Sequence, residues 1–434
     1  MKKVAVLIIF GIFVTLNYGC SKKNTGQLQE KAAIPKGKIT VWVFSDEVNV
    51  NGLKAAIPAF KTLYPNIEPE IVAVAGSDVH TKLMTTIASG SGIPDAAHIG
   101  VWDTMNFVSK GALWDITDRV KPYVNDILPY QVAAYQDKER LYGIPWGGTA
   151  AAVYYRRDIF KSAGVDPDQI HTWTDFIMAG KKISSSSNGK VKMINLPVGT
   201  SGEKASLQHF QQLLTQQLGS SIYNAKGEIT INDAANVKAL NLIIEMINNG
   251  IGSNIEPWSP AEFGSWNNGS VATVVNASWM KGIIEGQAGN SGNWGIMKLP
   301  AFEDGSTRVS SAGGSGMVIP AAAKNKEAAW VFIEYFLTRP APQTEAYKLG
   351  CPIPSLLTTY SDETFKKPEN YWGGQVAGNF FTQIEPQVPP VYYGKDYREI
   401  MTSILPEGIW KAVTGKTGAQ TALDEVKAAI ESKL

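Results

Sequence analysis

The chain has 434 residues, which is too long for a single ordinary hydrophobic core, so we expect two domains or lobes. A hydrophobic content of 44% beside 18% charged residues is typical of a soluble globular protein. The formal net charge is only +1, and no run of Lys and Arg is interleaved with stacking aromatics. The charge pattern therefore gives no support for nucleic-acid binding.

The N-terminus has the pattern of an export signal. Met1-Lys2-Lys3 is a basic head, and the apolar run over residues 4–14 is too short to span a membrane. Cys20 follows, in an arrangement that resembles bacterial lipoprotein signals, where cleavage leaves the cysteine as the lipidated first residue; Leu16 lies one place earlier than usual. We expect an extracytoplasmic protein held on a bacterial membrane by acyl chains at Cys20. Ordinary cleavage with free secretion is the alternative.

Only one further cysteine is present. If Cys20 is acylated, Cys351 has no disulfide partner, and a core of this size does not need one. Residues 21–37 are polar and rich in Lys, Gln and Asn, so they are expected to form a flexible tether.

Strands and helices alternate after the tether. Extended segments are predicted at 39–44, 67–74 and 94–99, and helices at 53–64 and 79–88. The near-uniform apolarity of 39–44 predicts burial on both faces. Pro58 predicts a helix that is kinked or starts late. This order favours right-handed βαβ units and a parallel sheet.

The stretch from Leu141 to Arg157 organises the rest of the chain. Tyr142–Trp146 is predicted to be extended, Gly147 and Gly148 relax the backbone, and a second strand follows over residues 150–155. Two strands joined by a Gly-rich kink suit a crossing between two lobes, because the kink absorbs large changes in φ and ψ. An ordinary hairpin or bulge is the alternative.

A second α/β set occupies the middle of the chain. Helices are predicted at 173–183, 207–218, 232–247 and 329–337, and extended segments at 191–198, 271–275, 294–300 and 316–320. Residues 294–300 and the Pro-stiffened 350–354 are candidates for a second and a third crossing. The part from Tyr397 onward is predicted to be helical, with few functional signals.

The chain resembles the extracellular solute-binding proteins of ABC importers, in the carbohydrate-binding family that includes maltose-binding protein. The order and spacing of short motifs over nearly all of the mature chain carry the resemblance. They are Ala88-Ser89-Gly90 with Pro94-Asp95; Gly111-Ala112-Leu113 with Ile116-Thr117-Asp118; Tyr142-Gly143-Ile144-Pro145 with Tyr154-Tyr155-Arg156-Arg157-Asp158-Ile159-Phe160; Ala163-Gly164-Val165 with Thr172-Trp173; Asn276-Ala277-Ser278-Trp279; Leu299-Pro300; and Gly313-Gly314-Ser315-Gly316 with Ala328-Ala329-Trp330. Arg156, where the family often has Asn, and the apolar pair Val101-Trp102 are departures.

The resemblance implies an α/β, two-lobed periplasmic-binding-protein fold with three hinge crossings and a ligand cleft between the lobes. We assign residues 1–20 to the signal peptide, 21–37 to the tether, 38–146 plus 300–350 to lobe 1, and 147–299 plus 351–434 to lobe 2. It also implies a monomer that captures a sugar or oligosaccharide by cleft closure and delivers it to the permease subunits of an ABC transporter. No cofactor, metal or catalysed reaction is implied.

A sugar ring has hydroxyl groups around its edge and apolar C–H groups on its faces. Sugar-binding sites therefore combine polar groups with aromatic side chains that stack on the ring. The chain has twelve tryptophans, more than a core of this length usually holds. Trp279 matches a family tryptophan that lines the cleft. The other candidates lie past predicted strand ends, at crossings or in Gly-rich loops: Asp46, Glu47, Trp102, Asp103, Trp146, Gly147, Asn276, Ser278, Gly314, Ser315 and Trp372.

These residue types also have structural explanations. Asp103 suits a helix N-cap, Asn276 a turn, and any of the tryptophans a core. Trp258 and Trp266 flank Glu262 and are further candidates for an aromatic wall, with Trp266 more typical of a helix core.

Two other functions remain open from the sequence. A glycosidase needs two opposed carboxylates, which Asp46, Glu47, Asp103 and Glu262 offer in principle, but no hydrolase motif is present. The same fold also serves non-sugar solutes such as polyamines or anions. Neither an acidic cage nor an arginine cluster is evident, and the tryptophan surplus favours a sugar.

Overall fold

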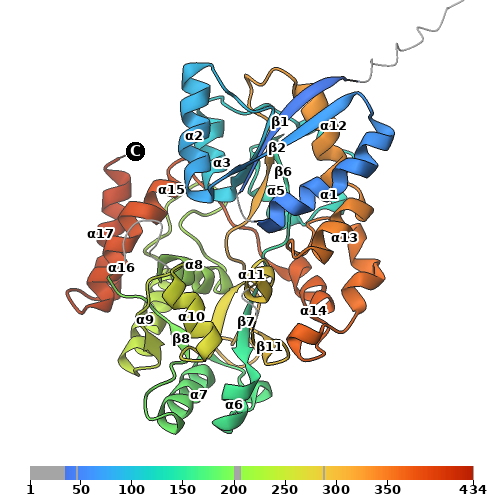
Figure 1. Ribbon diagram of the computed structural model, residues 1–434. Coiled ribbons are helices and arrows are strands. Elements are labelled where there is room, and N and C mark those ends of the chain that lie inside the picture. The colour runs from blue at the N-terminus through green and yellow to red at the C-terminus, as the bar shows by residue number, and fades with distance from the viewer. Residues whose placement is uncertain (1–34, 45–46, 200–206, 287–288, 434) are drawn as a thin grey trace, which may run out of the picture. The chain divides into compact units, whose positions relative to one another are not determined.

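The computed structural model describes residues 35–44, 47–199, 207–286 and 289–433 (Figure 1). The predicted signal peptide, Cys20 and most of the tether lie outside the described residues. The strands are β1 Gly37–Phe44, β2 Ile67–Val74, β3 Ala96–Gly100, β4 Gln136–Asp137, β5 Arg140–Leu141, β6 Gly143–Pro145, β7 Ala151–Arg156, β8 Ile194–Asn195, β9 Gly252–Ser253, β10 Thr273–Ala277, β11 Trp294–Lys298 and β12 Ser315–Val318.

The helices include most of those predicted from periodicity. They are α1 Glu47–Leu63, α2 Gly76–Ser89, α3 Val101–Ser109, α4 Thr117–Val120, α5 Pro129–Ala133, α6 Arg157–Ser162, α7 Trp173–Ser186, α8 Leu207–Gln217, α9 Ala234–Asn248, α10 Pro260–Asn268, α11 Met280–Gly286, α12 Lys326–Leu337, α13 Pro340–Lys348, α14 Ala377–Ile384, α15 Tyr397–Glu399, the π-helix η8 Ile400–Ile404, α16 Leu405–Val413 and α17 Ala419–Glu431. Pro58 lies well inside α1, so the prediction of a late helix start is wrong.

The first sheet has the strand order β2-β1-β3-β12-β6. β1 pairs in parallel with both β2 and β3, as the alternation of strands and helices predicts. β12 runs antiparallel to β3 and to β6, so a strand from late in the chain sits in the middle of an N-terminal sheet. This sheet therefore combines strands that are far apart in sequence.

Helices cover both faces of the first sheet. Ile39, Val41 and Val43 of β1 point into a core formed with α1 and α12, while Trp42 and Phe44 pack less completely on the opposite side. The burial of β1 thus alternates with period two, and the predicted full burial of both faces is wrong.

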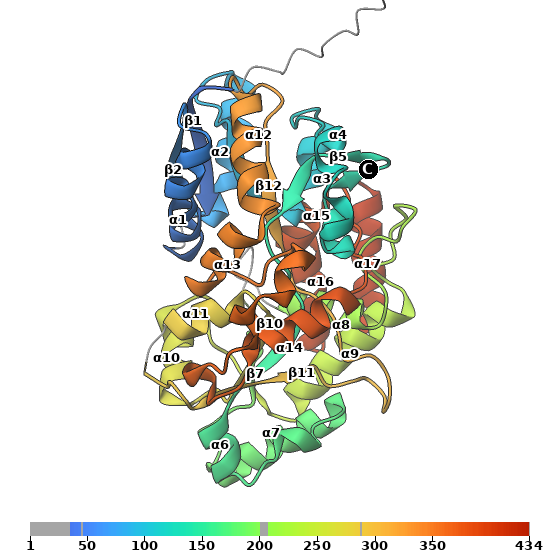
Figure 2. The same ribbon diagram turned by 90° about the vertical axis from the view of Figure 1, so that its right-hand side faces the viewer.

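The second sheet is smaller, with β7 between β10 and β11, both antiparallel to it. β7, the strand predicted over residues 150–155, is buried along its whole length. Val153 and Tyr155 point into a core with α7, α8 and α9, and Ala152 and Tyr154 into a core with α11 and α14. Figure 2 shows the C-terminal helices α16 and α17 beside α8 and α9, and their apolar faces join the first of these cores.

Three segments connect the two sheets, and they lie side by side. Gly147 pairs with Pro354, and Ala150 pairs with Ser311. The first and third crossings thus fall where the sequence predicts them. The second differs: β11, at the start of the predicted 294–300 crossing, pairs with β7 within the second sheet, and the chain passes to the first sheet further on, beside Ala150.

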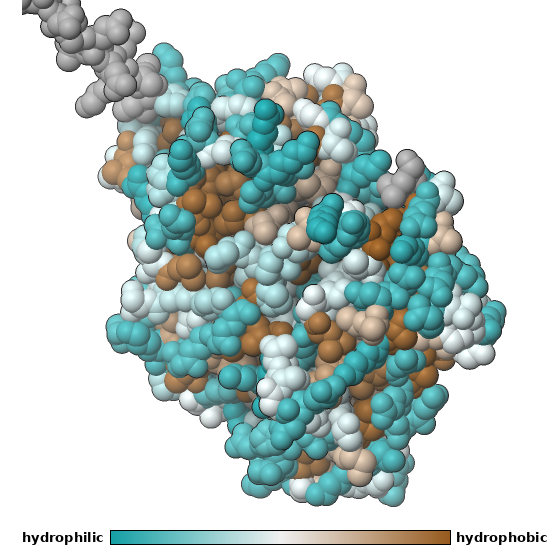
Figure 3. Space-filling view, turned by 180° about the vertical axis from the view of Figure 1, so that it is seen from behind, coloured by the Kyte–Doolittle hydropathy of each residue, from teal (hydrophilic) through white to brown (hydrophobic). Residues whose placement is uncertain are grey.

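Within the described ranges, no helix is both long and apolar enough to cross a bilayer. Figure 3 shows hydrophilic side chains over much of one face, with hydrophobic ones gathered in one larger group in its upper half and in smaller groups below. Cys351 is buried, and its Sγ lies 3.3 Å from the carbonyl oxygen of Val48.

Candidate functional site

A cavity of about 530 Å³ lies among elements of both sheets and the segments that connect them. Four of its lining residues are tryptophans, and backbone of all three crossings reaches it. Aromatic and polar side chains both line it, among them Trp102, Asp103, Thr149, Asn195, His209, Trp258, Glu262, Trp266, Asn276, Trp279, Ser315 and Arg398. Apolar plates and polar groups that converge on one cavity are the mark of a small-molecule site.

Seven of the predicted site residues line this cavity: Trp102, Asp103, Gly147, Asn276, Trp279, Gly314 and Ser315. The structure therefore brings together positions spread over nearly half of the chain. Asp46 lies outside the described residues. Glu47 begins α1, and its side chain is also outside what the structure describes.

Three predicted residues do not line the cavity, which corrects their expected placement. Trp146 is 2% exposed and turns into the first-sheet core, with its ring 4.6 Å from that of His98. Trp372 is fully buried, and its indole N–H donates to Glu285 Oε1 at 2.7 Å. Ser278 is buried beneath the first crossing, where its Oγ lies 2.8 Å from the carbonyl oxygen of Gly148.

Asp103 reaches the cavity but is already paired. Its Oδ1 lies 3.0 Å from His80 Nδ1 and 3.2 Å from Arg398 Nη1. His80 belongs to α2, which packs on the first sheet. Arg398 belongs to α15, and the adjacent residue of that helix, Tyr397, packs in the core that contains α8 and α9. The carboxylate predicted to accept sugar hydroxyls therefore also joins the two sides of the cleft. The C-terminal helices, from which little function was predicted, supply its cation.

Trp102 makes a second contact between the two sides. Its ring stacks on that of His209, with 4.7 Å between centroids and 18° between planes. His209 comes from the Gln-rich helix α8 and was not predicted as a site residue. Burial lowers the pKa of His209 to about 4, so this imidazole is neutral at neutral pH.

Beneath the first crossing lies a group that we call the hinge cluster: Tyr130, Thr149, Ala150, Ser278 and Glu385. Glu385 is fully buried at its centre. Its carboxyl oxygens accept from Tyr130 Oη at 2.6 Å and from the backbone N–H groups of Thr149 and Ala150 at 3.1 and 3.0 Å, and one lies 3.0 Å from Ser278 Oγ. A residue from late in the chain thus fixes the backbone of an early crossing.

The hinge cluster explains the Gly-rich kink. A Cβ at Gly148 would lie 2.3–2.5 Å from the carboxyl atoms of Glu385, so no larger residue fits without movement. Burial raises the pKa of Glu385 to about 7, against the opposing effect of its hydrogen bonds. A carboxyl group that titrates near neutrality therefore sits where the lobes are joined.

One side of the cavity is an aromatic wall made of Trp258, Trp266 and Trp279. Trp279 is half-buried after β10, and its Nε1 donates to the carbonyl oxygen of Ala312 at 3.1 Å. The ring of Trp258 lies nearly parallel to that of Trp279, 6.0 Å away and inclined by 25°. Phe263 packs edge-on against both Trp258 and Trp266 from α10. The wall is thus supported from behind by other aromatic rings.

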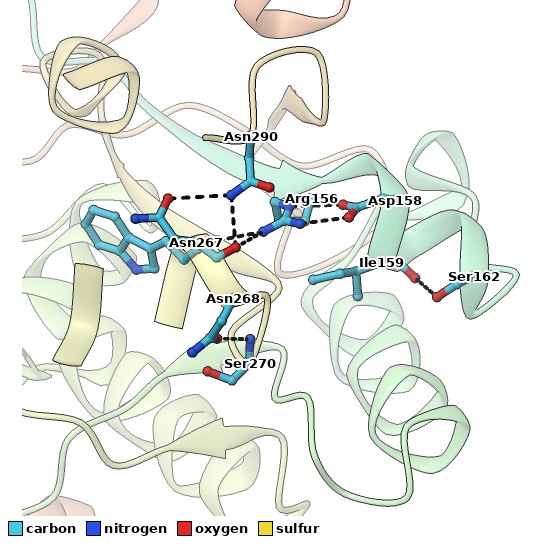
Figure 4. Close-up of polar contacts among 9 residues, drawn as sticks. Arg156, Asp158, Ile159, Ser162, Asn267, Asn268, Ser270 and Asn290 are labelled. Carbon is cyan, nitrogen blue, oxygen red and sulfur yellow. Dashed lines mark hydrogen bonds and ion pairs between the residues drawn. The ribbon is translucent and has the colours of Figure 1, made fainter. Parts of the chain in front are cut away.

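Arg156, the departure noted in the sequence, anchors the helix that carries part of this wall. Its guanidinium donates to both carboxyl oxygens of Asp158, at 2.9 and 2.7 Å, and to the carbonyl oxygen of Trp266 at 2.6 Å (Figure 4). Asn290 Nδ2 also donates to the carbonyl oxygen of Asn267, at 2.9 Å. A cation and an amide thus satisfy carbonyl groups at the C-terminal end of α10, where the helix dipole favours positive charge.

The described residues contain no group of three His, Cys, Asp or Glu side chains able to hold a metal ion. Glu262, one of the carboxylates that a glycosidase could use, accepts from the N–H of Trp258 at 2.7 Å and from Asn195 Nδ2 at 2.9 Å. Asp103 and Glu262 are thus both engaged with protein groups.

Comparisons with known proteins agree with this architecture. Residues 45–341 match the family described as bacterial extracellular solute-binding protein. The chain is 26% identical to a lactose-binding protein of Rhizobium radiobacter over 412 residues, 92% of each chain, and 25% identical to an arabinooligosaccharide-binding protein of Bacillus subtilis over the full length of both. Among solved structures, an ABC-transporter-associated binding protein of B. animalis subsp. lactis in complex with β-1,6-galactobiose superimposes with a TM-score of 0.76 at 21% identity, covering 91% of this chain and 97% of that one.

Proposed function

The chain belongs to the bacterial extracellular solute-binding protein family, and from this premise we propose that it captures a sugar or oligosaccharide outside the cytoplasm and delivers it to an ABC permease. The observation that carries the proposal is the aromatic wall, which lines a cavity among elements of both sheets together with polar groups. Indole faces suit the C–H faces of sugar rings, and amide and carboxylate groups suit their hydroxyls. The sugar-binding relatives support the same ligand class.

In this proposal Trp279 stacks on the sugar, and Asn276, Ser315 and the backbone at Gly147 and Gly314 contact its polar rim. Asp103 either binds a hydroxyl or acts only through its pairs with His80 and Arg398. The lobes are those assigned from the sequence, 38–146 plus 300–350 and 147–299 plus 351–434. They close over the ligand by bending at the crossings.

The protein acts as a binding protein and not as an enzyme in this proposal. A glycosidase requires one carboxyl group to donate a proton and another to attack or activate water. Asp103 and Glu262 are instead held by hydrogen bonds and ion pairs that fix protein groups. Incubation of the purified protein with oligosaccharides should leave them intact, and the release of products would overturn this part of the proposal.

We also propose that acyl chains on Cys20 hold the protein, as a monomer, on the outer side of a bacterial membrane. The export-signal pattern and the polar stretch after it support this arrangement. Cell fractionation tests it: the wild type should sediment with membranes, and Cys20→Ala should not carry the lipid. A lipid-free wild type in the medium would favour ordinary cleavage.

The ligand class is tested by thermal melting against sugars, polyamines and inorganic anions. A ligand at one hundred times its Kd stabilises the native state by about 2.7 kcal/mol, which raises the melting temperature. We expect galactose-, glucose- or arabinose-containing sugars to raise it and the other classes to leave it unchanged, with calorimetry giving the Kd. Stabilisation by a polyamine or an anion alone would replace the sugar with that class.

A further inference from the structure

A histidine is buried in the first sheet, directly behind the cavity. His98 belongs to β3, and its side chain is only 1% exposed. Its ring packs between those of Phe44 and Trp146, with centroids 4.2 and 4.6 Å away. An imidazole in such apolar surroundings loses its hydration, so its burial is unfavourable unless a hydrogen bond compensates. A role beyond packing would explain why a polar ring occupies this position.

The register of β12 on β3 provides that hydrogen bond. His98 pairs with Met317, and residues two apart in a strand point to the same face, so Ser315 shares the face of His98. His98 Nε2 lies 2.7 Å from Ser315 Oγ. Ser315 is half-buried and lines the cavity, whereas His98 lies behind it. The buried imidazole therefore contacts a hydroxyl group that a ligand can reach.

The second ring nitrogen indicates where the imidazole carries its proton. Nδ1 of His98 is buried, and no hydrogen-bond partner faces it among the described residues. Burial lowers the pKa of His98 to about 3, so the ring is neutral at neutral pH and has a single N–H. A proton on Nδ1 would be a buried donor without an acceptor, and such donors are rarer in proteins than acceptors without a donor. The arrangement therefore favours a proton on Nε2.

We propose that His98 is a positioning residue for the ligand: its Nε2–H donates to Ser315 Oγ and leaves the serine hydroxyl to donate into the cavity. A serine hydroxyl has one proton and rotates to suit its neighbours, so a donor on one side directs that proton away from itself. The inference rests on the proposed function and deepens it. It requires the ligand to present an acceptor to Ser315, such as a hydroxyl, ring or glycosidic oxygen, and not an ammonium group.

This pair differs from the serine and histidine of a hydrolase. In a hydrolase the imidazole takes the serine proton, and a carboxylate holds its other nitrogen. An imidazole with a pKa of about 3 is too weak a base for that step. Among the described residues, no carboxylate is bonded to Nδ1 of His98. The contact therefore suits binding and not catalysis.

Nitrogen NMR of protein with labelled histidines tests the hydrogen bond without any ligand. The chemical shifts of the two ring nitrogens distinguish the protonated from the unprotonated one, and the signals lost in His98→Gln identify those of His98. At pH 7 we expect a protonated Nε2 and an unprotonated Nδ1, and Ser315→Ala should shift the Nε2 signal. A proton on Nδ1 would overturn the proposal.

Calorimetric titration tests the effect on binding, with lactose, β-1,6-galactobiose and linear arabinooligosaccharides as probes. His98→Leu should weaken the tightest of these roughly three- to tenfold. The melting temperature should not fall, because the change also removes the unpaired Nδ1. His98→Gln, which keeps an N–H donor, should restore part of the affinity. In a Ser315→Ala background, His98→Leu should cause no further loss, since the histidine acts through the serine.

His171→Leu is the matched control, because His171 is an exposed histidine away from the cavity, and it should leave affinity unchanged. If His98→Leu does not fold, His98→Asn, whose shorter amide does not reach Ser315, takes its place. Wild-type affinity in the His98 variant, or a loss that adds to that of Ser315→Ala, would limit His98 to packing. If none of these sugars binds the wild type, the proposed function fails, and the NMR measurement alone decides whether His98 donates to Ser315.

Discussion

The hinge cluster and the aromatic wall border the same cavity but are built in opposite ways. In the hinge cluster, a fully buried carboxyl group is surrounded by donors and every contact is internal to the protein. In the aromatic wall, large apolar rings face the cavity, and Trp258 is half exposed on a strained backbone. The first arrangement fixes the crossings, and the second leaves surface available to a ligand.

This difference implies that the two regions respond differently to mutation. Substitutions in the hinge cluster leave buried polar groups without partners, so they should reduce the free energy of unfolding. Substitutions in the wall remove surface that the free protein exposes, so they should reduce ligand affinity with much less effect on stability.

The largest effect is expected for Glu385→Ala. This change removes the acceptor of the buried Ala150 N–H and leaves a cavity beneath the first crossing. An unpaired buried donor and a cavity of this size together cost roughly 3–5 kcal/mol. Urea denaturation at pH 6 measures the loss. Tyr130→Phe, which removes only one donor, is the control and should cost less. Equal stability of Glu385→Ala and the wild type would show that the hinge cluster does not fix the crossing.

The second expected effect is a pH dependence that comes from Glu385. Because burial raises its pKa from 4.5 to about 7, its contribution to stability is full below about pH 4.5 and is lost as the pH rises through about 7. Its neighbours Tyr130 and Tyr360 stay neutral in this range, since burial raises the pKa of each well above 10. The loss amounts to about 3 kcal/mol.

The variant Glu385→Gln isolates this contribution, because it does not titrate. Its stability relative to the wild type should rise between about pH 4.5 and about pH 7, most steeply midway between these two values, and level off at higher pH. Buried His98, whose pKa is lowered to about 3, acts in the opposite direction as the pH falls, but it is present in both proteins and cancels in the difference. A stability difference that is constant with pH would mean that Glu385 is not buried as described.

The same contrast explains what the sequence predicts well and what it does not. Strand β7 and helix α9 follow from hydrophobic period and length alone, because those signals are local. The pairing of β12 with β3 and β6 requires a contact between distant segments, which hydrophobic period does not predict. Two lobes were expected from the length of the chain and from the resemblance to a known family.

Site residues at strand ends show why local context is insufficient. Trp146 and Trp279 both follow a strand of an α/β sheet, yet the ring of Trp146 packs edge-on against Phe336 in a core while that of Trp279 faces the cavity. The pleat and the neighbouring helices decide which way each ring points. Glu385 and Arg398 were missed because each lies in a short helical turn without a pattern and meets its partners only after the chain has folded.

A smaller effect, on binding, is expected for Trp279→Ala. Loss of the stacking surface should weaken sugar affinity about tenfold or more, while the melting temperature of the free protein falls only slightly. Calorimetry and thermal melting measure the two quantities on the same preparation. Trp372→Ala is the contrasting variant, since Trp372 is fully buried and its loss should destabilise the fold. If Trp279→Ala lowers stability as much as Trp372→Ala, the wall belongs to the core and the comparison fails.

The smallest effect is expected for Arg398→Gln. This change removes the cation that Arg398 places 3.2 Å from Asp103, between the C-terminal helices and α3, but His80 remains beside the carboxylate. Stability should therefore fall by no more than about 1 kcal/mol. If the pair favours the closed cleft, sugar affinity should fall severalfold, and small-angle scattering should show a larger radius of gyration in the free variant. Lys348→Gln, which breaks an exposed pair with Glu345 on α13, is the matched control. The same affinity in both variants would limit the Asp103–Arg398 pair to a structural contact and leave closure to the crossings alone.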